Sequence, residues 1–137
     1  MQTFIVYLML LLGASVMSAQ NSIEVSLMEF DNNDGTVEVG LYNQEGEFLE
    51  RTYKALSSEI KEKKAIVTFN NIPDGIYAIS CYHDKNGDGK LNMFMNIMPS
   101  EPYGTSNNAR GFFGPPKWED ARFEVKQGEI KQLSIKM

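Results

Sequence analysis

Apolar and polar side chains alternate in short segments along most of this chain, and turn residues separate one segment from the next. Ile23, Val25 and Leu27 form one such segment, and the alternation resumes at 37–41 after the Asn- and Asp-rich turn 31–35. A period of two puts successive side chains on opposite faces of a β-strand, whereas a helix needs apolar residues three or four positions apart. Helical periodicity of useful length is missing, so we expect an all-β domain.

The alternation and its turn signals predict about seven strands. They cover residues 23–27, 37–41, 48–53, 65–69, 76–83, 121–125 and 130–137. The turn 31–35 is expected to join the first two strands as a hairpin, and a turn at Gln127-Gly128 to join the last two. The polar stretch 57–64 is expected to be a solvated connection. Strands of this number and spacing are typical of a two-sheet sandwich.

The first 19 residues carry no charged side chain, and residues 4–12 form an almost unbroken apolar run followed by small residues. This is the layout of a signal peptide, although no Lys or Arg precedes the run. The run is too short for a membrane span, which needs about 20 apolar residues. We therefore expect a signal peptide at 1–19 and one domain at 20–137, periplasmic or secreted and without membrane insertion of the mature chain.

Charge and cysteine content narrow the possible partners. The chain has 13 basic and 18 acidic residues, a net charge of −5. This acidity argues against nucleic acid as a partner and is compatible with divalent cations. Because Cys81 is the only cysteine, an internal disulfide is excluded. An exported domain without a disulfide must depend on packing, or on packing together with a bound ion.

The stretch 84–120 interrupts the strand pattern. Irregular loops longer than about 12–15 residues are uncommon in compact domains. This one is rich in aromatic and methionine side chains, which disordered segments rarely carry. We therefore expect one long ordered loop that packs on the domain.

The start of this loop, D-K-N-G-D-G-K, matches the first half of a calcium-binding loop. Oxygen side chains at alternate positions of a tight turn converge on one cation, and the following Gly takes the sharp bend. The expected ligands are the side chains of Asp84, Asn86 and Asp88, the carbonyl of Lys90, Asn92 through water, and Glu101 from further along the chain. Met95 stands where an EF-hand has its bidentate Glu, so an EF-hand is rejected. The alternative is a turn that holds no metal.

Further residues are candidates for binding or catalysis. Tyr103, Phe112 and Trp118 are expected to pack under the long loop, because aromatic side chains in an ordered segment must bury surface. The alternative is that they form an aromatic platform, which would make the protein a carbohydrate- or peptide-binding accessory module with a metal-free turn at 84–90. The partner would be an unknown glycan, peptide or protein at the cell envelope. Cys81 is expected to be a buried small hydrophobe, and His83 to hydrogen-bond a loop carbonyl. No catalytic motif is present, so we expect no enzyme.

Several runs of this sequence together resemble the bacterial domain of unknown function DUF2141. They are 83–92, 99–108, 113–116 and 118–121, with 37–43 and 69–77 in support. The resemblance implies an exported bacterial protein with an immunoglobulin-like or transthyretin-like sandwich, and it implies no established activity. It departs at Asn92, where the family usually carries Asp, which weakens that ligand.

Overall fold

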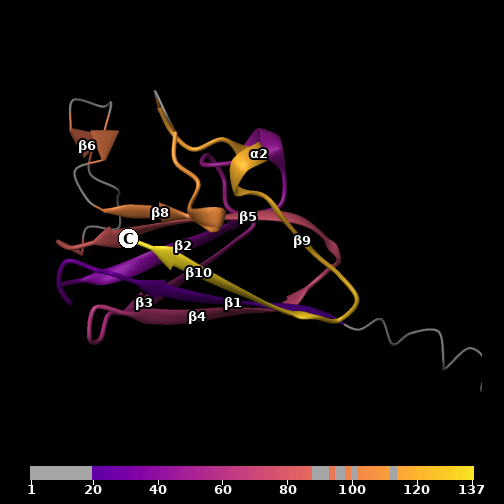
Figure 1. The fold of residues 1–137 in the computed structure, drawn as a ribbon, viewed down its shortest axis with the longest axis horizontal. Helices are drawn as coiled ribbons and strands as arrows, with labels where there is room; N and C mark the ends of the chain where they lie inside the picture. The colour runs from indigo at the N-terminus through magenta and orange to yellow at the C-terminus, as the bar shows by residue number, and fades with distance from the viewer. Residues whose placement is uncertain (1–19, 88–92, 95–97, 100–101, 112–113) are drawn as a thin grey trace, which may run out of the picture.

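The computed structural model describes residues 20–87, 93–94, 98–99, 102–111 and 114–137, and Figure 1 shows the path of the chain. The protein is an all-β sandwich, as expected, with eight strands in two sheets rather than seven. The three-stranded sheet has the order β10-β1-β4, formed by Ile130–Lys136, Asn21–Met28 and Ala65–Ile72. The five-stranded sheet has the order β3-β2-β5-β8, and β9 also pairs with β5. Its strands are β3 (Lys54–Glu59), β2 (Thr36–Tyr42), β5 (Gly75–Asp84), β8 (Tyr103–Thr105) and β9 (Phe123–Val125). A separate pair joins β6, Met93–Phe94, to β7, Met98–Pro99.

The core lies between the two sheets. In β1 every second residue is buried, and Ile23, Val25 and Leu27 point inward. The inner sides of β2 and β5 face them, with Val39 and Ile79 both almost fully excluded from solvent. Full burial of an aliphatic side chain of this size stabilises the fold by about 1.5–3 kcal/mol. The alternation therefore identified the inner faces correctly.

The two expected hairpins are wrong. β1 and β2 belong to different sheets, because the chain crosses between the sheets through 29–35 instead of turning back. Phe30 packs into the core at this crossing, with 2% of its surface exposed. Glu29 and Gly35, at the two ends of the crossing, have positive φ angles of 64°. At the other end of the chain, β9 pairs with β5, whereas β10 runs parallel to β1.

The stretch 48–53 is not a strand. A short 3₁₀ helix, η1 (Glu45–Glu47), is followed by a turn in which the backbone N–H groups of Glu50 and Arg51 donate to the carbonyl of Glu47. The edge strand β3 begins only at Lys54 and includes the first three residues, 57–59, of the stretch 57–64 that was expected to be a solvated connection. Most of β3 is solvent-exposed, and its apolar residues, Ala55 and Leu56, are adjacent, so its sequence shows no alternation.

The later part of the long segment after β5 packs on the domain. It contains β8, the 3₁₀ turn η2 (Ser106–Asn108) and the short helix α2 (Trp118–Ala121). In Figure 1, β8 and α2 lie on one side of β5, while β1 and β4 lie on the other. Ser106 and Ala121 are completely buried. Across the described residues, no helix is long and apolar enough to cross a membrane.

Candidate functional site

The candidate calcium loop starts where β5 ends. Asp84 is the last residue of this strand, lies opposite Thr36 of β2, and is only 2% exposed. The chain then turns through Lys85 and Asn86 to Gly87, whose φ of 68° lies in the left-handed region that glycine adopts without strain. The D-x-N-G turn predicted from the sequence is therefore present. Its first residue, Asp84, is buried, and Asn86 is exposed.

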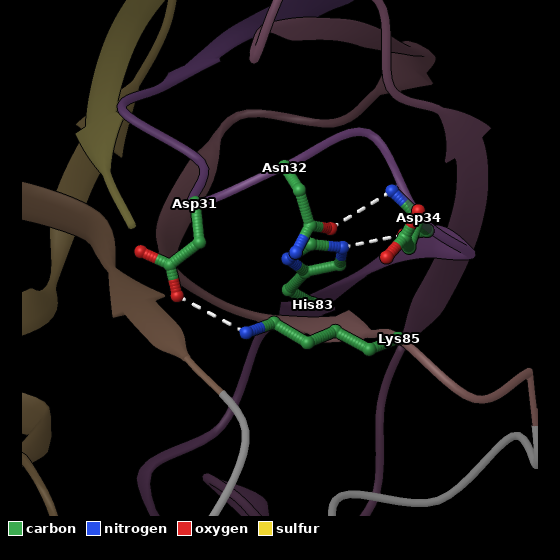
Figure 2. Close-up of polar contacts among 5 residues, drawn as sticks. All are labelled: Asp31, Asn32, Asp34, His83 and Lys85. Atoms are coloured by element: carbon green, nitrogen blue, oxygen red, sulfur yellow. Dashed lines mark hydrogen bonds and ion pairs between the residues drawn. The ribbon is translucent and has the colours of Figure 1, made fainter.

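A second Asn- and Asp-rich loop, 31–35, packs directly against this turn (Figure 2). A Cβ atom on Gly35 would lie 1.9 Å from the backbone oxygen of Asp84, so only glycine fits there. The Lys85 ammonium group lies 3.1 Å from a carboxylate oxygen of Asp31. Within the loop, the Asn32 side-chain oxygen accepts a hydrogen bond from the Asp34 N–H at 2.9 Å. The sequence of 31–35 predicts a hairpin turn, and its pattern does not indicate the contact with Asp84 and Lys85.

His83 links the loop 31–35 to the turn that follows β5. Its Nε2 lies 2.5 Å from the backbone carbonyl of Asp34, which confirms the expected hydrogen bond to a loop carbonyl. The imidazole ring is fully buried. Its centroid lies 5.2 Å from the centroid of the Phe30 ring, and the two rings are nearly perpendicular. Its Nδ1 has no hydrogen-bond partner among the described residues. His83 is therefore part of the packing that fixes the Asp84 end of β5.

The expected ligands divide into two groups. Asp84 and Asn86 lie in the described turn, whereas Asp88, Lys90, Asn92 and Glu101 lie outside the described residues. In the part of the chain that the structure describes, no three His, Cys, Asp or Glu side chains are close enough to hold a metal together. Asp84 and Asn86 supply one carboxylate and one amide oxygen.

The far end of the long segment is attached to β5 by protein hydrogen bonds. The Ser106 hydroxyl accepts from the Ile79 N–H at 2.9 Å and donates to the Ala121 carbonyl at 2.6 Å. Asn107, in a left-handed conformation, donates to the carbonyl of Arg122 at 2.9 Å. These bonds join β5, η2 and α2 without help from a metal.

Two neighbouring residues extend this attachment to β10. The Asn108 side-chain oxygen accepts from the Lys136 N–H at 3.1 Å. Gly104 lies so close to β10 that a Cβ would come within 2.5 Å of the Ile135 side chain. β8, at the edge of the five-stranded sheet, and η2 therefore lie against β10 at the edge of the other sheet, and the close approach at Gly104 leaves no room for a side chain.

One family model matches most of the chain. Residues 25–132 match the model of a family described as an uncharacterized protein conserved in bacteria, DUF2141. The chain belongs to this family. The match runs from β1 into β10 and so covers both sheets and both ends of the long segment. No curated protein and no solved structure matches the chain.

In this DUF2141 member Tyr103 and Trp118, two residues of the alternative aromatic platform, contact different partners. Trp118 packs edge-on against Phe48 at 5.8 Å, and Phe48 packs against Tyr42 at 5.3 Å. Tyr103, by contrast, lies 6.0 Å from the guanidinium group of Arg110. Phe112 lies outside the described residues. Sequence analysis missed Phe48 because it lies in a turn that we had taken for a strand.

Cys81 points into the core of the sandwich. It is 1% exposed, and its sulfur lies 3.4 Å from the carbonyl of Gly104. Burial raises the pKa of the thiol to about 12, although the hydrogen bond to Gly104 opposes this shift. At neutral pH the sulfur is therefore a protonated, buried group, as expected for a small hydrophobe.

Proposed function

We propose that this protein is an exported, non-enzymatic β-sandwich of the cell envelope whose Asp84 loop binds a structural Ca²⁺ ion. The observation that carries the proposal is the turn at the end of β5, where Asp84 begins the D-x-N-x-D-G sequence and the chain turns through Asn86 and Gly87. Oxygen side chains at alternate positions of such a turn converge on one cation. Calcium accepts the oxygen ligands that the following sequence offers.

The ligand set would begin in the described turn and be completed outside it. Asp84 and Asn86 would contribute side-chain oxygens, and Asp88, Lys90, Asn92 and Glu101 are the candidates for the rest. Calcium takes 6–8 oxygen ligands, and sites with few carboxylates bind weakly, with dissociation constants of about 10⁻⁴ to 10⁻³ M. Occupancy at this affinity suits a protein outside the cytoplasm.

The ion's role would be local. Ser106 and Asn107 already attach the far end of the long segment to β5 and α2. The near end leaves β5 at Asp84, beside a loop that carries Asp31 and Asp34. A divalent cation there would offset the negative charge of both loops and fix the chain as it leaves the sheet.

Thermal unfolding tests the calcium site. If the dissociation constant is about 10⁻³ M, adding about 10 mM Ca²⁺ stabilises the fold by about 1.4 kcal/mol. For a domain of this size that raises the Tm by about 4–8 °C. The rise should vanish in Asp84→Asn plus Asp88→Asn and persist in Asp120→Asn plus Glu124→Gln, which removes two exposed carboxylates elsewhere. An unchanged Tm in the native protein at this Ca²⁺ concentration would refute the site.

Export is tested separately. The full chain produced in a bacterium should appear outside the cytoplasm with its new N-terminus near residue 20, as measured by fractionation and intact mass. Replacing Leu8 and Leu11 in the apolar run by Lys should retain the uncleaved chain inside the cell, because that run is what the export machinery recognises. Full-length native protein in the cytoplasmic fraction would contradict the proposal.

A further inference from the structure

A cleft of about 550 Å³ lies away from the Asp84 site, between the turn after η1 and the chain leading into α2. Its volume falls within the range of about 300–1,000 Å³ that is typical of ligand sites. The apolar part of its lining is formed by Phe48, Leu49, Pro115, Pro116 and Trp118. All of these residues lie in the described parts of the chain, so the cleft is independent of the proposed calcium ligands.

The aromatic part of the lining has a rigid base. Phe48 and Trp118 pack against a second small core of buried alanines, Ala78 from β5 with Ala109 and Ala121. Because alanine is small, α2 and η2 approach β5 closely. The Phe48 and Trp118 rings meet edge to face. The rings are half-buried, with one side against this core and the rest at the cleft.

The turn after η1 brings Leu49 to the cleft. Leu49 has a φ of 66°, a left-handed conformation that residues in other turns of this chain, Glu62 and Gln127 among them, also adopt. The turn that imposes it is closed by hydrogen bonds to the Glu47 carbonyl, and it leaves Leu49 at the cleft.

The charged part of the lining is acidic. Glu45, Glu50 and Glu119 contribute carboxylates and Lys117 a single ammonium group, a net charge of −2. The nearby Arg51 pairs with Glu47, outside this lining, at 3.8 Å. A cationic ligand is therefore favoured over a neutral or anionic one.

We propose that this cleft binds an extended peptide segment in which Lys or Arg residues alternate with proline or other apolar residues. Proline-rich segments dock into aromatic-lined grooves in the extended polyproline conformation, at a low cost in conformational entropy. A basic side chain can lie over the Trp118 ring and reach a carboxylate beside it. This inference goes beyond the calcium proposal and does not require the ion.

Trp118 is the only tryptophan, so its fluorescence reports on the cleft directly. A short peptide of alternating Lys and Pro should change the emission in a saturable way, and a Glu-Pro peptide of the same length should not. Added salt should weaken the binding, because exposed charges are screened. Adding EGTA should leave it unchanged, which separates failure of the cleft from failure of the calcium site.

Two triple variants provide the matched comparison. Replacing Glu45, Glu50 and Glu119 by Gln should weaken binding of the Lys-Pro peptide at least about tenfold. Replacing the exposed Glu59, Glu62 and Glu124 by Gln removes the same charge elsewhere and should leave it unchanged. The inference is overturned if the Lys-Pro peptide gives no fluorescence response at millimolar concentration, or if the Glu-Pro peptide binds equally well. It is also overturned if both triple variants weaken binding alike, or if only a neutral oligosaccharide changes the fluorescence.

Discussion

The outer faces of β1 and β5 lie in opposite environments, although both strands sit in the middle of a sheet. On β1 the outward residues are polar and half-exposed, as Glu24 and Ser26 illustrate. On β5 the outward residues include Ala78 and Asp84, which are almost completely buried. A second layer, made up of η2, α2 and the turn after η1, covers the outer face of β5 around Ala78. The proposed calcium site lies where β5 ends, and the proposed peptide cleft lies between the turn after η1 and the chain leading into α2.

The difference lies in what covers the outer face of each sheet. The three-stranded sheet contributes one apolar face to the core and leaves the other in water, which is the usual arrangement for a partly exposed sheet. The outer side of β5 instead carries side chains that accept a covering layer: Ala78 is small enough for close packing, and the backbone of Ile79 bonds to Ser106. The main core and the layer that covers β5 are therefore expected to differ in stability.

The largest effect is expected between the sheets. Phe69 of β4 is 2% exposed, and Phe69→Ala should cost about 3–5 kcal/mol because it leaves a cavity in the main core. Urea denaturation followed by circular dichroism measures this loss. Ile66→Ala is the matched control, since Ile66 is 63% exposed on the same strand and its truncation should change stability by less than about 0.5 kcal/mol. Equal losses in the two variants would mean that the core is not where the sandwich places it.

A smaller effect is expected where the second layer joins β5. Ser106→Ala leaves the Ile79 N–H and the Ala121 carbonyl without their hydrogen-bond partner, which should cost about 1–3 kcal/mol. Hydrogen exchange should speed up at the Ile79 amide, while the β1 amides should change only by the global loss of stability. Ser134→Ala, at an exposed position of β10, should have little effect. Unchanged exchange at Ile79 would show that Ser106 does not hold the layer.

The smallest effect concerns pH. The pKa of Cys81 is raised from 9.0 in the unfolded chain to about 12 in the folded one, chiefly by burial. Its contribution to stability is therefore complete below pH 9 and decreases as pH rises towards 12, by up to about 1.4 kcal/mol per pH unit. Urea midpoints measured between pH 8 and about 10.5 should fall more steeply in the native protein than in Cys81→Ala. Parallel pH profiles would contradict the burial of the thiol.

Much of the inner architecture was predictable from local pattern. The all-β class followed from alternation, and the inward positions on β1, β2 and β5 were correct. Cys81 and His83 took the structural roles expected for a buried thiol and a histidine at the end of a strand. Alternation and residue type report which face of a strand is apolar, and they need no knowledge of the partner strand.

Only the tertiary structure decided which strands pair and which distant loops meet. The turn at 31–35 reads equally well as a hairpin or as a crossing between sheets, and the burial of Phe30 selects the crossing. That choice brings Asp31 beside Lys85, and the covering of β5 brings Phe48 beside Trp118. Turn sequences restrict a few dihedral angles, whereas the direction in which the chain continues is determined by long-range burial between the two sheets.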